Sequence, residues 1–224
     1  MPPEKTKLIK QLLLVLAIGL ILRLAITKLG WRLPSLWENR RISAALVLWI
    51  VFGLYWAIAG LDSSPTKTSE SSASTYFHQF ILAAAFLLVI FPVPGLTGWF
   101  LPPTFRFVWA VAVTLQAAFL LLALWARRHL GRNWSAEVRI AVDHHLVRTG
   151  PYRWLRHPIY TAMLGMFLGT AIASGQYHAL LGLALLFIAY LRKTRLEDQI
   201  LQQTFGAEYD EYRRGTWALV PLLF

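Results

Sequence analysis

Cysteine is absent from this sequence, and acidic residues are scarce. Without cysteine the chain has no disulfide, no thiolate nucleophile and no cysteine-ligated metal site, and we predict no metal centre. Only 11 acidic residues stand against 22 basic ones, which gives a formal net charge of +11. The basic residues flank apolar runs, as charges that set membrane topology do, and do not cover a soluble face. We therefore expect no nucleic-acid partner.

Long apolar runs dominate what the sequence does contain. Hydrophobic residues make up 57% of the chain and the mean hydropathy is +0.50, values outside the range of ordinary soluble proteins. Several runs reach about 20 residues, the length that a helix needs to cross about 30 Å of hydrocarbon. We therefore predict an all-α integral membrane protein with about six transmembrane helices, at residues 8–29, 42–61, 76–91, 105–126, 159–174 and 177–192.

The C-terminal part is predicted to form a helical hairpin followed by a cytoplasmic amphipathic helix. A turn at residues 175–176 joins the last two apolar helices, and Gly165, Gly169 and Gly182 would let them pack closely. As an alternative, the first two of these glycines would line a groove that admits a lipid tail. The amphipathic helix is expected at residues 192–214, where apolar and charged residues alternate with helical spacing.

Basic residues also predict the orientation. The loop 127–156 holds seven arginines against two acidic residues, and the positive-inside rule places such a loop in the cytoplasm. We expect the active site on that side. Whether the first helix fully spans stays open, because the basic link 30–41 would then face outward. One structural domain is expected, with transmembrane helices in 1–126, a Ser/Thr-rich linker at 62–75 and a functional core in 127–224.

The stretch 143–160 concentrates aromatic, imidazole and guanidinium side chains between two apolar runs. Pro151 and Pro158 restrict its backbone and that of the residue before each, so this is a shaped loop. Such a surface can stack on an adenine and hold an anion. It can equally serve as a basic juxtamembrane loop that binds lipid headgroups.

Two motifs carry a resemblance to a known family. G-P-Y-x-x-x-R-H-P-x-Y begins at Gly150, and F-G-x-E-Y-x-x-Y begins at Phe205 after an E-D pair at 197–198. In this order, over about residues 130–221, they resemble the C-terminal core of the isoprenylcysteine carboxyl methyltransferase family, to which phospholipid N-methyltransferases are related. The resemblance implies a multi-pass membrane enzyme that uses S-adenosyl-L-methionine to methylate a lipophilic or lipidated acceptor among membrane lipids. It does not predict the oligomeric state.

The resemblance also implies which residues form the site. Lys193 falls where the prenylcysteine enzymes have an arginine that steadies the substrate carboxylate, and Glu137 falls where they have a glutamine. Both departures weaken the assignment of prenylcysteine as the substrate more than that of methyl transfer. Lys193, Arg195 and Arg156 are the expected catalytic cations. The expected cofactor-binding residues are Glu137, His144, His145, Leu146, Val147, Tyr152, His157, Pro158, Tyr160, Glu197 and Asp198.

Charge alone also directs attention to the carboxylates at 197 and 198. S-adenosyl-L-methionine carries two positive charges against one carboxylate, so its site needs at least one protein carboxylate, and this chain has few. The alternative is a simple i, i+4 ion pair between Lys193 and Glu197 on one helix face, worth a few tenths of a kcal/mol.

Several functions remain open at this point. R-H-P-x-Y also occurs, by resemblance, in NADPH-dependent sterol and steroid reductases of the membrane, although their final motif reads more like K-Y-G-x-x-W-x-x-Y-C. A phospholipid amine N-methyltransferase and a non-enzymatic lipid-binding protein are also compatible with the sequence. The sequence does not identify the acceptor, nor whether oxygen, nitrogen or sulfur is methylated.

Overall fold

The structure is a computed structural model, and it describes residues 40–221 except 60–65, 70–71, 92, 94, 97, 103–105, 132–138 and 142–145. Helices dominate the described residues, which confirms the prediction of a helical fold. In chain order the elements are α2 (Arg40–Ala59), β1 (Thr66–Ser69), α3 (Ser72–Ile90), α4 (Arg106–Leu130), β2 (Arg139–Ala141), the 3-10 helix η3 (Gly150–Arg153), α5 (Pro158–Ser174), α6 (Tyr177–Phe205) and α7 (Ala207–Arg214).

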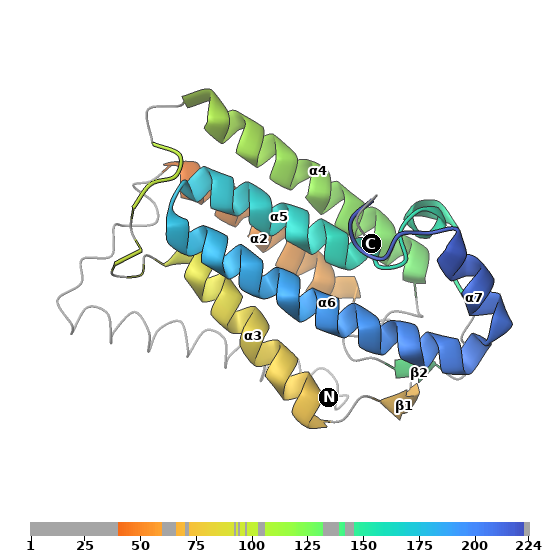
Figure 1. Cartoon of the computed structure of the whole chain (residues 1–224). Helices are drawn as coiled ribbons and strands as arrows, with labels where there is room; N and C mark the ends of the chain where they lie inside the picture. The colour runs from red at the N-terminus through yellow and green to blue at the C-terminus, as the bar shows by residue number, and fades with distance from the viewer. Residues whose placement is uncertain are drawn as a thin grey trace, which may run out of the picture.

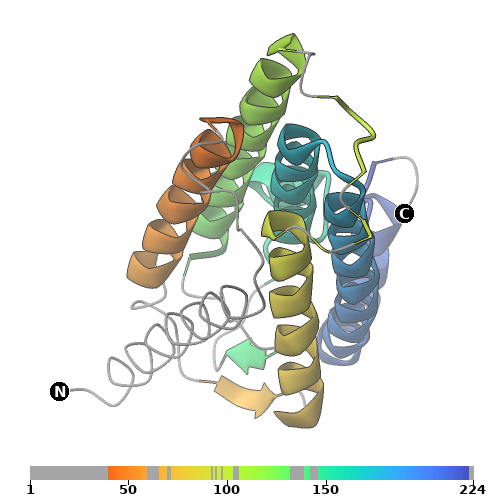
Figure 2. The ribbon, with the colours of Figure 1, turned by 90° about the vertical axis from the view of Figure 1, so that its left-hand side faces the viewer.

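The long helices form a bundle in which α5 and α6 lie side by side at the centre (Figure 1). Helix α4 packs along α5, α3 packs along α6, and α2 packs against α4 and α5 (Figure 2). Trp49 joins α2 to α5. Its indole nitrogen donates to the Thr170 hydroxyl at 3.0 Å, and its ring contacts that of Phe167 edge-on at 4.8 Å. The hairpin predicted from the turn at 175–176 is confirmed.

One described helix, Phe107–Leu130, is long and apolar enough to cross a membrane. Shorter apolar segments cover Ala44–Ala59, Tyr76–Val89 and Pro158–Ser174. Large apolar side chains on the outside of the bundle, such as Phe80 at 72% exposed, are in keeping with contact with lipid. Six spans remain a prediction, since the first predicted helix, at 8–29, lies outside the described residues.

The last long helix differs from its predicted boundaries. A new helix was expected to start at residue 192, but α6 runs without a break from Tyr177 to Phe205. The break comes at Gly206, where φ is 53°, and α7 follows in a different direction (Figure 1). Glycine adopts this left-handed conformation at little cost, whereas other residues are strained there. Helix α6 therefore carries both apolar packing residues and the polar residues Lys193, Glu197 and Asp198.

The glycines of the predicted hairpin interface contact other helices. A Cβ atom at Gly165 would lie 2.1 Å from the Phe119 ring, and one at Gly169 would lie 2.8 Å from the carbonyl oxygen of Ala112, both on α4. Gly182 faces α3, with the carbonyl oxygen of Ala85 2.8 Å from the added atom. The prediction that these glycines pack α5 on α6 is wrong. The alternative lipid groove at residues 165 and 169 is also wrong, because α4 fills that space.

A two-stranded antiparallel sheet, which the all-α prediction did not include, joins two distant parts of the chain. Thr66 pairs with Ala141 and Ser69 pairs with Arg139. The stretch 62–75, predicted to be a linker, is thus partly structured and pairs with the arginine-rich loop. The sheet lies at the end of the bundle where α6 runs on toward α7 (Figure 1).

Candidate functional site

The G-P-Y motif is shaped by its glycine and its proline. Gly150 has φ 59°, and a Cβ atom there would lie 2.3 Å from the imidazole of His129 at the end of α4. Only glycine allows both the positive φ and this close approach. Pro151, buried at the first turn of η3, fixes the backbone that follows. The loop is thereby held against α4.

The C-terminal tail holds the R-H-P segment through the backbone. The Arg156 amide donates to the Trp217 carbonyl at 2.8 Å, the His157 amide donates to the Ala218 carbonyl at 3.1 Å, and the Trp217 amide donates to the Trp154 carbonyl at 3.0 Å. The Arg156 guanidinium also donates to the carbonyl oxygen of Arg213 in the last turn of α7, at 3.1 Å, and to that of Thr216 just after α7. The sequence alone did not indicate this role for the tail.

His157 lies between two carboxylates on successive residues of α6. Its Nε2 atom is 2.7 Å from Asp198 Oδ1, and its Nδ1 atom is 3.1 Å from Glu197 Oε2. Burial alone would lower the pKa of His157, but the hydrogen bonds and charges of these carboxylates outweigh burial and raise its pKa to about 9. The imidazole is therefore a cation at neutral pH.

Each carboxylate has a tyrosine partner as well. The Tyr160 hydroxyl donates to Glu197, and the Tyr209 hydroxyl of α7 donates to Asp198 at 2.5 Å. Arg156 adds its Nε atom 3.6 Å from Asp198 Oδ2. Burial would raise the pKa of both carboxyls, yet His157 and these partners hold both pKa values below their usual range. Both side chains are thus anionic at neutral pH.

Four aromatic rings run through the site in sequence. The rings of His157 and Tyr160 stack at 5.7 Å, and those of Tyr160 and Tyr190 stack at 4.6 Å. Beyond them, the ring of His78 on α3 lies 5.8 Å from that of Tyr190 at an angle of 50°. We call these four residues the ring column. It connects α5, α6 and α3 at one end of the bundle.

Most of the predicted site residues that the structure describes come together here. Lys193 is buried one turn before Glu197, and its charge acts on that carboxylate. Tyr152 is buried beside the same carboxylate, and its carbonyl accepts a hydrogen bond from the Tyr212 hydroxyl at 2.7 Å. The predicted residues in or next to the cluster are Tyr152, Arg156, His157, Pro158, Tyr160, Lys193, Glu197 and Asp198.

The remaining predicted residues lie apart from the cluster. Arg195 is exposed, two positions beyond Lys193 and so on the far side of α6. Leu146 and Val147 are half-buried and take part in none of the contacts of His157 or the two carboxylates. Glu137, His144 and His145 lie outside the described residues.

Three contributors were missed by sequence analysis. Tyr190 shares a helix face with Lys193 and Glu197, three and seven positions further on, so helical spacing was a usable signal. Tyr209 belongs to the quoted F-G-x-E-Y motif, but was given no role. For His78 no local signal exists, because only the packing of α3 on α6 brings it to the site.

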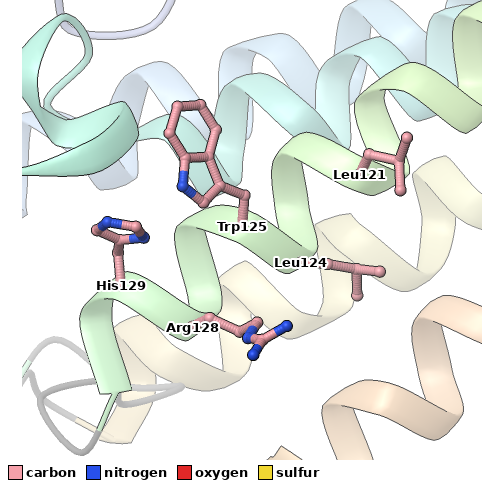
Figure 3. Close-up of a pocket in the computed structure, with 5 residues that line it drawn as sticks. All are labelled: Leu121, Leu124, Trp125, Arg128 and His129. Carbon is pink, nitrogen blue, oxygen red and sulfur yellow. The ribbon is translucent and has the colours of Figure 1, made fainter.

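A separate hollow lies on the outer face of α4 (Figure 3). It is next to the loop, since the Trp125 ring lies 6.3 Å from that of Trp154. None of the residues of the ring column or the carboxylate pair lines it, so we give it no part in the chemistry. Its lining is Leu121, Leu124, Trp125, Arg128 and His129.

Comparisons with known proteins identify relatives of this region. Residues 107–208 match the sequence model of the family described as phospholipid methyltransferase. The chain is 29% identical over 125 residues to a protein-S-isoprenylcysteine O-methyltransferase of Schizosaccharomyces pombe, covering 53% of each chain. It is 30% identical over 82 residues to the protein of the same name of Saccharomyces cerevisiae, covering 36% of this chain and 34% of the relative.

A third relative has a different name. The nickel-cobalt-cadmium resistance protein NccN of Alcaligenes xylosoxydans xylosoxydans is 37% identical over 97 residues, covering 42% of this chain and 45% of the relative. The chain thus spans about half the length, or less, of these curated relatives. The family match at 107–208 includes the part of the chain that holds the carboxylate pair.

Proposed function

We propose that this chain, whose residues 107–208 match the phospholipid methyltransferase family model and which is similar to protein-S-isoprenylcysteine O-methyltransferases, belongs to the isoprenylcysteine carboxyl methyltransferase family and transfers the methyl group of S-adenosyl-L-methionine to a lipophilic carboxylate. The observation that carries the proposal is the buried cluster in which His157 joins Glu197 and Asp198. The proposed enzyme is a multi-pass membrane protein whose site faces the cytoplasm. Its acceptor is a lipidated molecule of the prenylcysteine type.

The chemistry of the cluster fits the proposed cofactor. The side chains of Glu197 and Asp198 are 20% and 15% exposed, so both anionic groups reach the surface of the cluster. Among the described residues, each Glu197 oxygen has one hydrogen-bond partner, and a carboxylate oxygen accepts more than one. Glu197 would hold the cationic part of the cofactor, and Tyr152 with Pro158 would flank its adenine. When bound, S-adenosyl-L-methionine supplies an electrophilic methyl group on its sulfonium.

The protonation of His157 favours a carboxylate acceptor over an amine. An amine must lose a proton before it attacks, so the site would need a general base. His157 has a pKa of about 9 and is already protonated at neutral pH. A carboxylate needs no base, and the protein then contributes position and charge. Lys193 and Arg156 are the cations of the cluster that would hold such an acceptor.

The side chains have separate tasks in this proposal. His157 and Tyr160 each hydrogen-bond to one oxygen of the Glu197 carboxylate. These two bonds fix the orientation of the carboxylate and so of its remaining lone pairs. Asp198 fixes the other side of the imidazole and joins α6 to α7 through Tyr209. The stacked rings of Tyr160 and Tyr190 close the apolar side of the site. A rigid set of contacts of this kind lowers the cost of orienting the reactants.

Cofactor binding tests the proposal and separates it from the reductase alternative. Detergent-purified protein should be stabilised against heat by S-adenosylhomocysteine and not by NADPH, because a ligand raises stability when it binds the native state. Glu197→Gln should weaken S-adenosylhomocysteine binding about ten- to a hundredfold, as expected for the loss of a charge-assisted hydrogen bond.

Glu208→Gln is the matched control, because this glutamate is exposed and pairs with Arg148 at 2.8 Å on the surface. It should bind the cofactor as the wild type does. Stabilisation by NADPH alone would establish the reductase. Equal binding by the 197 and 208 variants would remove Glu197 from the site.

A further inference from the structure

The hollow on the outer face of α4 changes in character along the helix. Its five lining side chains follow helical spacing and so share one face of α4 (Figure 3). Leu121, Leu124 and Trp125 form its apolar end, and Arg128 with His129, in the last turn of the helix, forms its polar end. Because a helix rises 1.5 Å per residue, the two ends are about 10 Å apart along the axis.

The polar end of the hollow matches the level of lipid headgroups. Phe107–Leu130 is the described segment that is long and apolar enough to cross a membrane. From Phe107 to Arg128 the helix rises about 30 Å, which is the thickness of the hydrocarbon core. A span with Phe107 at one boundary of that core places Arg128 at the other, where phosphates lie. The apolar end then faces the acyl chains.

The charge inside the hollow is positive. Arg127 is 3% exposed and donates to two backbone carbonyls, so its guanidinium is used within the fold. Arg128, the next residue, is exposed and lines the hollow. No acidic residue is among the described residues of the lining. A guanidinium in this position suits a phosphate, which it can bind through two parallel hydrogen bonds.

The loop before His157 borders the hollow with aromatic and basic groups. The Trp154 ring lies 6.3 Å from that of Trp125, and the Arg153 guanidinium lies 5.5 Å from the Trp154 ring. Tryptophan is enriched at the boundary between hydrocarbon and headgroups. The hollow has a volume of about 650 Å³, within the usual range of about 300–1,000 Å³ for a small-molecule site.

We propose that this hollow binds one anionic phospholipid of the bilayer, with its phosphate on Arg128 and an acyl chain along Leu121 and Leu124. A phospholipid has an anionic group and an apolar chain in the order that the lining requires. A zwitterionic phospholipid has the same phosphate, but its ammonium group is repelled by Arg128, so the site prefers a lipid with net negative charge. The inference does not depend on methyl transfer.

The test measures lipid binding by native mass spectrometry of the detergent-purified protein. The two lipids are dioleoylphosphatidylglycerol and dioleoylphosphatidylcholine, which share their chains and differ in headgroup charge. The first phosphatidylglycerol should bind about fivefold more tightly than phosphatidylcholine, as expected for one basic residue near an anionic headgroup. Arg128→Gln should abolish this preference. Arg128→Lys should retain part of it, because lysine keeps the charge and lacks the planar fork.

Two further variants separate the site from general surface charge. Arg153→Gln removes the same charge from a neighbouring exposed position that does not line the hollow, and it should keep the lipid preference. Leu121→Trp fills the apolar end without changing the charge and should weaken binding of both lipids. Leu121 is 66% exposed, so the thermal midpoint of this variant should stay near that of the wild type.

Equal affinity of the wild type for the two lipids would overturn the inference. So would an equal loss of preference in Arg128→Gln and Arg153→Gln, which would assign the effect to diffuse surface charge. A dimer that Leu121→Trp dissociates, without any lipid preference, would assign the hollow to a second copy of the chain. A protein that shows the Arg128-dependent preference without methylating any acceptor would refute the proposed activity and leave the lipid site in place.

Discussion

The charge on His157 predicts how the stability of the protein depends on pH. The pKa of His157 is raised from 6.5 to about 9 in the folded protein. The stabilisation that the protonated imidazole gives the folded state is therefore fully present below pH 6.5 and is lost as the pH rises through 9. The difference between these two pKa values corresponds to about 3 kcal/mol. For a chain of this length, that amount shifts a thermal midpoint by about 6–12 °C.

The assay is thermal unfolding of the detergent-purified protein from pH 6 to pH 9.5. The wild-type midpoint should fall mainly between pH 6.5 and pH 9. Asp198→Asn removes the carboxylate 2.7 Å from His157 Nε2, so the pKa of His157 in the folded protein should fall toward 6.5. The loss of stability should then be smaller and should end at a lower pH. A flat wild-type profile over this range, or superimposable profiles for the two proteins, would refute the assignment of a protonated His157.

Two further predictions concern the backbone and the packing around the site. Trp217→Pro removes the amide that donates to the Trp154 carbonyl at 3.0 Å and should abolish S-adenosylhomocysteine binding. Trp217→Ala keeps the amide and should bind within about threefold of wild type. Calorimetry measures both affinities, and an equal loss in the two variants would assign the effect to the indole. Gly169→Leu places side-chain atoms against Ala112 and Gln116 on α4 and should destabilise the protein by about 1–3 kcal/mol. A thermal midpoint equal to that of the wild type would contradict this packing.

The centre of the site was predictable because negative charge is scarce in this chain. Few carboxylates are available, and Glu197 with Asp198 follows an apolar run, so their place beside the R-H-P motif could be inferred from the two motifs and the hairpin between them. The structure then adds what the pattern could not specify: His157 bridges both carboxylates, and its protonation follows from that bridging.

The missed features depend on contacts between distant segments. Small residues such as Gly165 and Gly182 predict close helix packing, but their sequence does not say which helix approaches, and here α4 and α3 do. The continuity of α6 through residue 192 was also missed, because a helix can extend beyond an apolar bundle without a break. His78 became part of the site only through the ring contact with Tyr190.

Formation of a methyl ester is the most direct test of the central claim. Purified protein is incubated with S-adenosyl-L-methionine carrying a labelled methyl group and with N-acetyl-S-prenylcysteine, its carboxamide or a phospholipid amine. We expect label in a base-labile ester of the acid, none in the carboxamide, and strong loss in Glu197→Gln but not in Glu208→Gln. Base-stable label in the amine with none in the acid would contradict carboxylate methylation by this site.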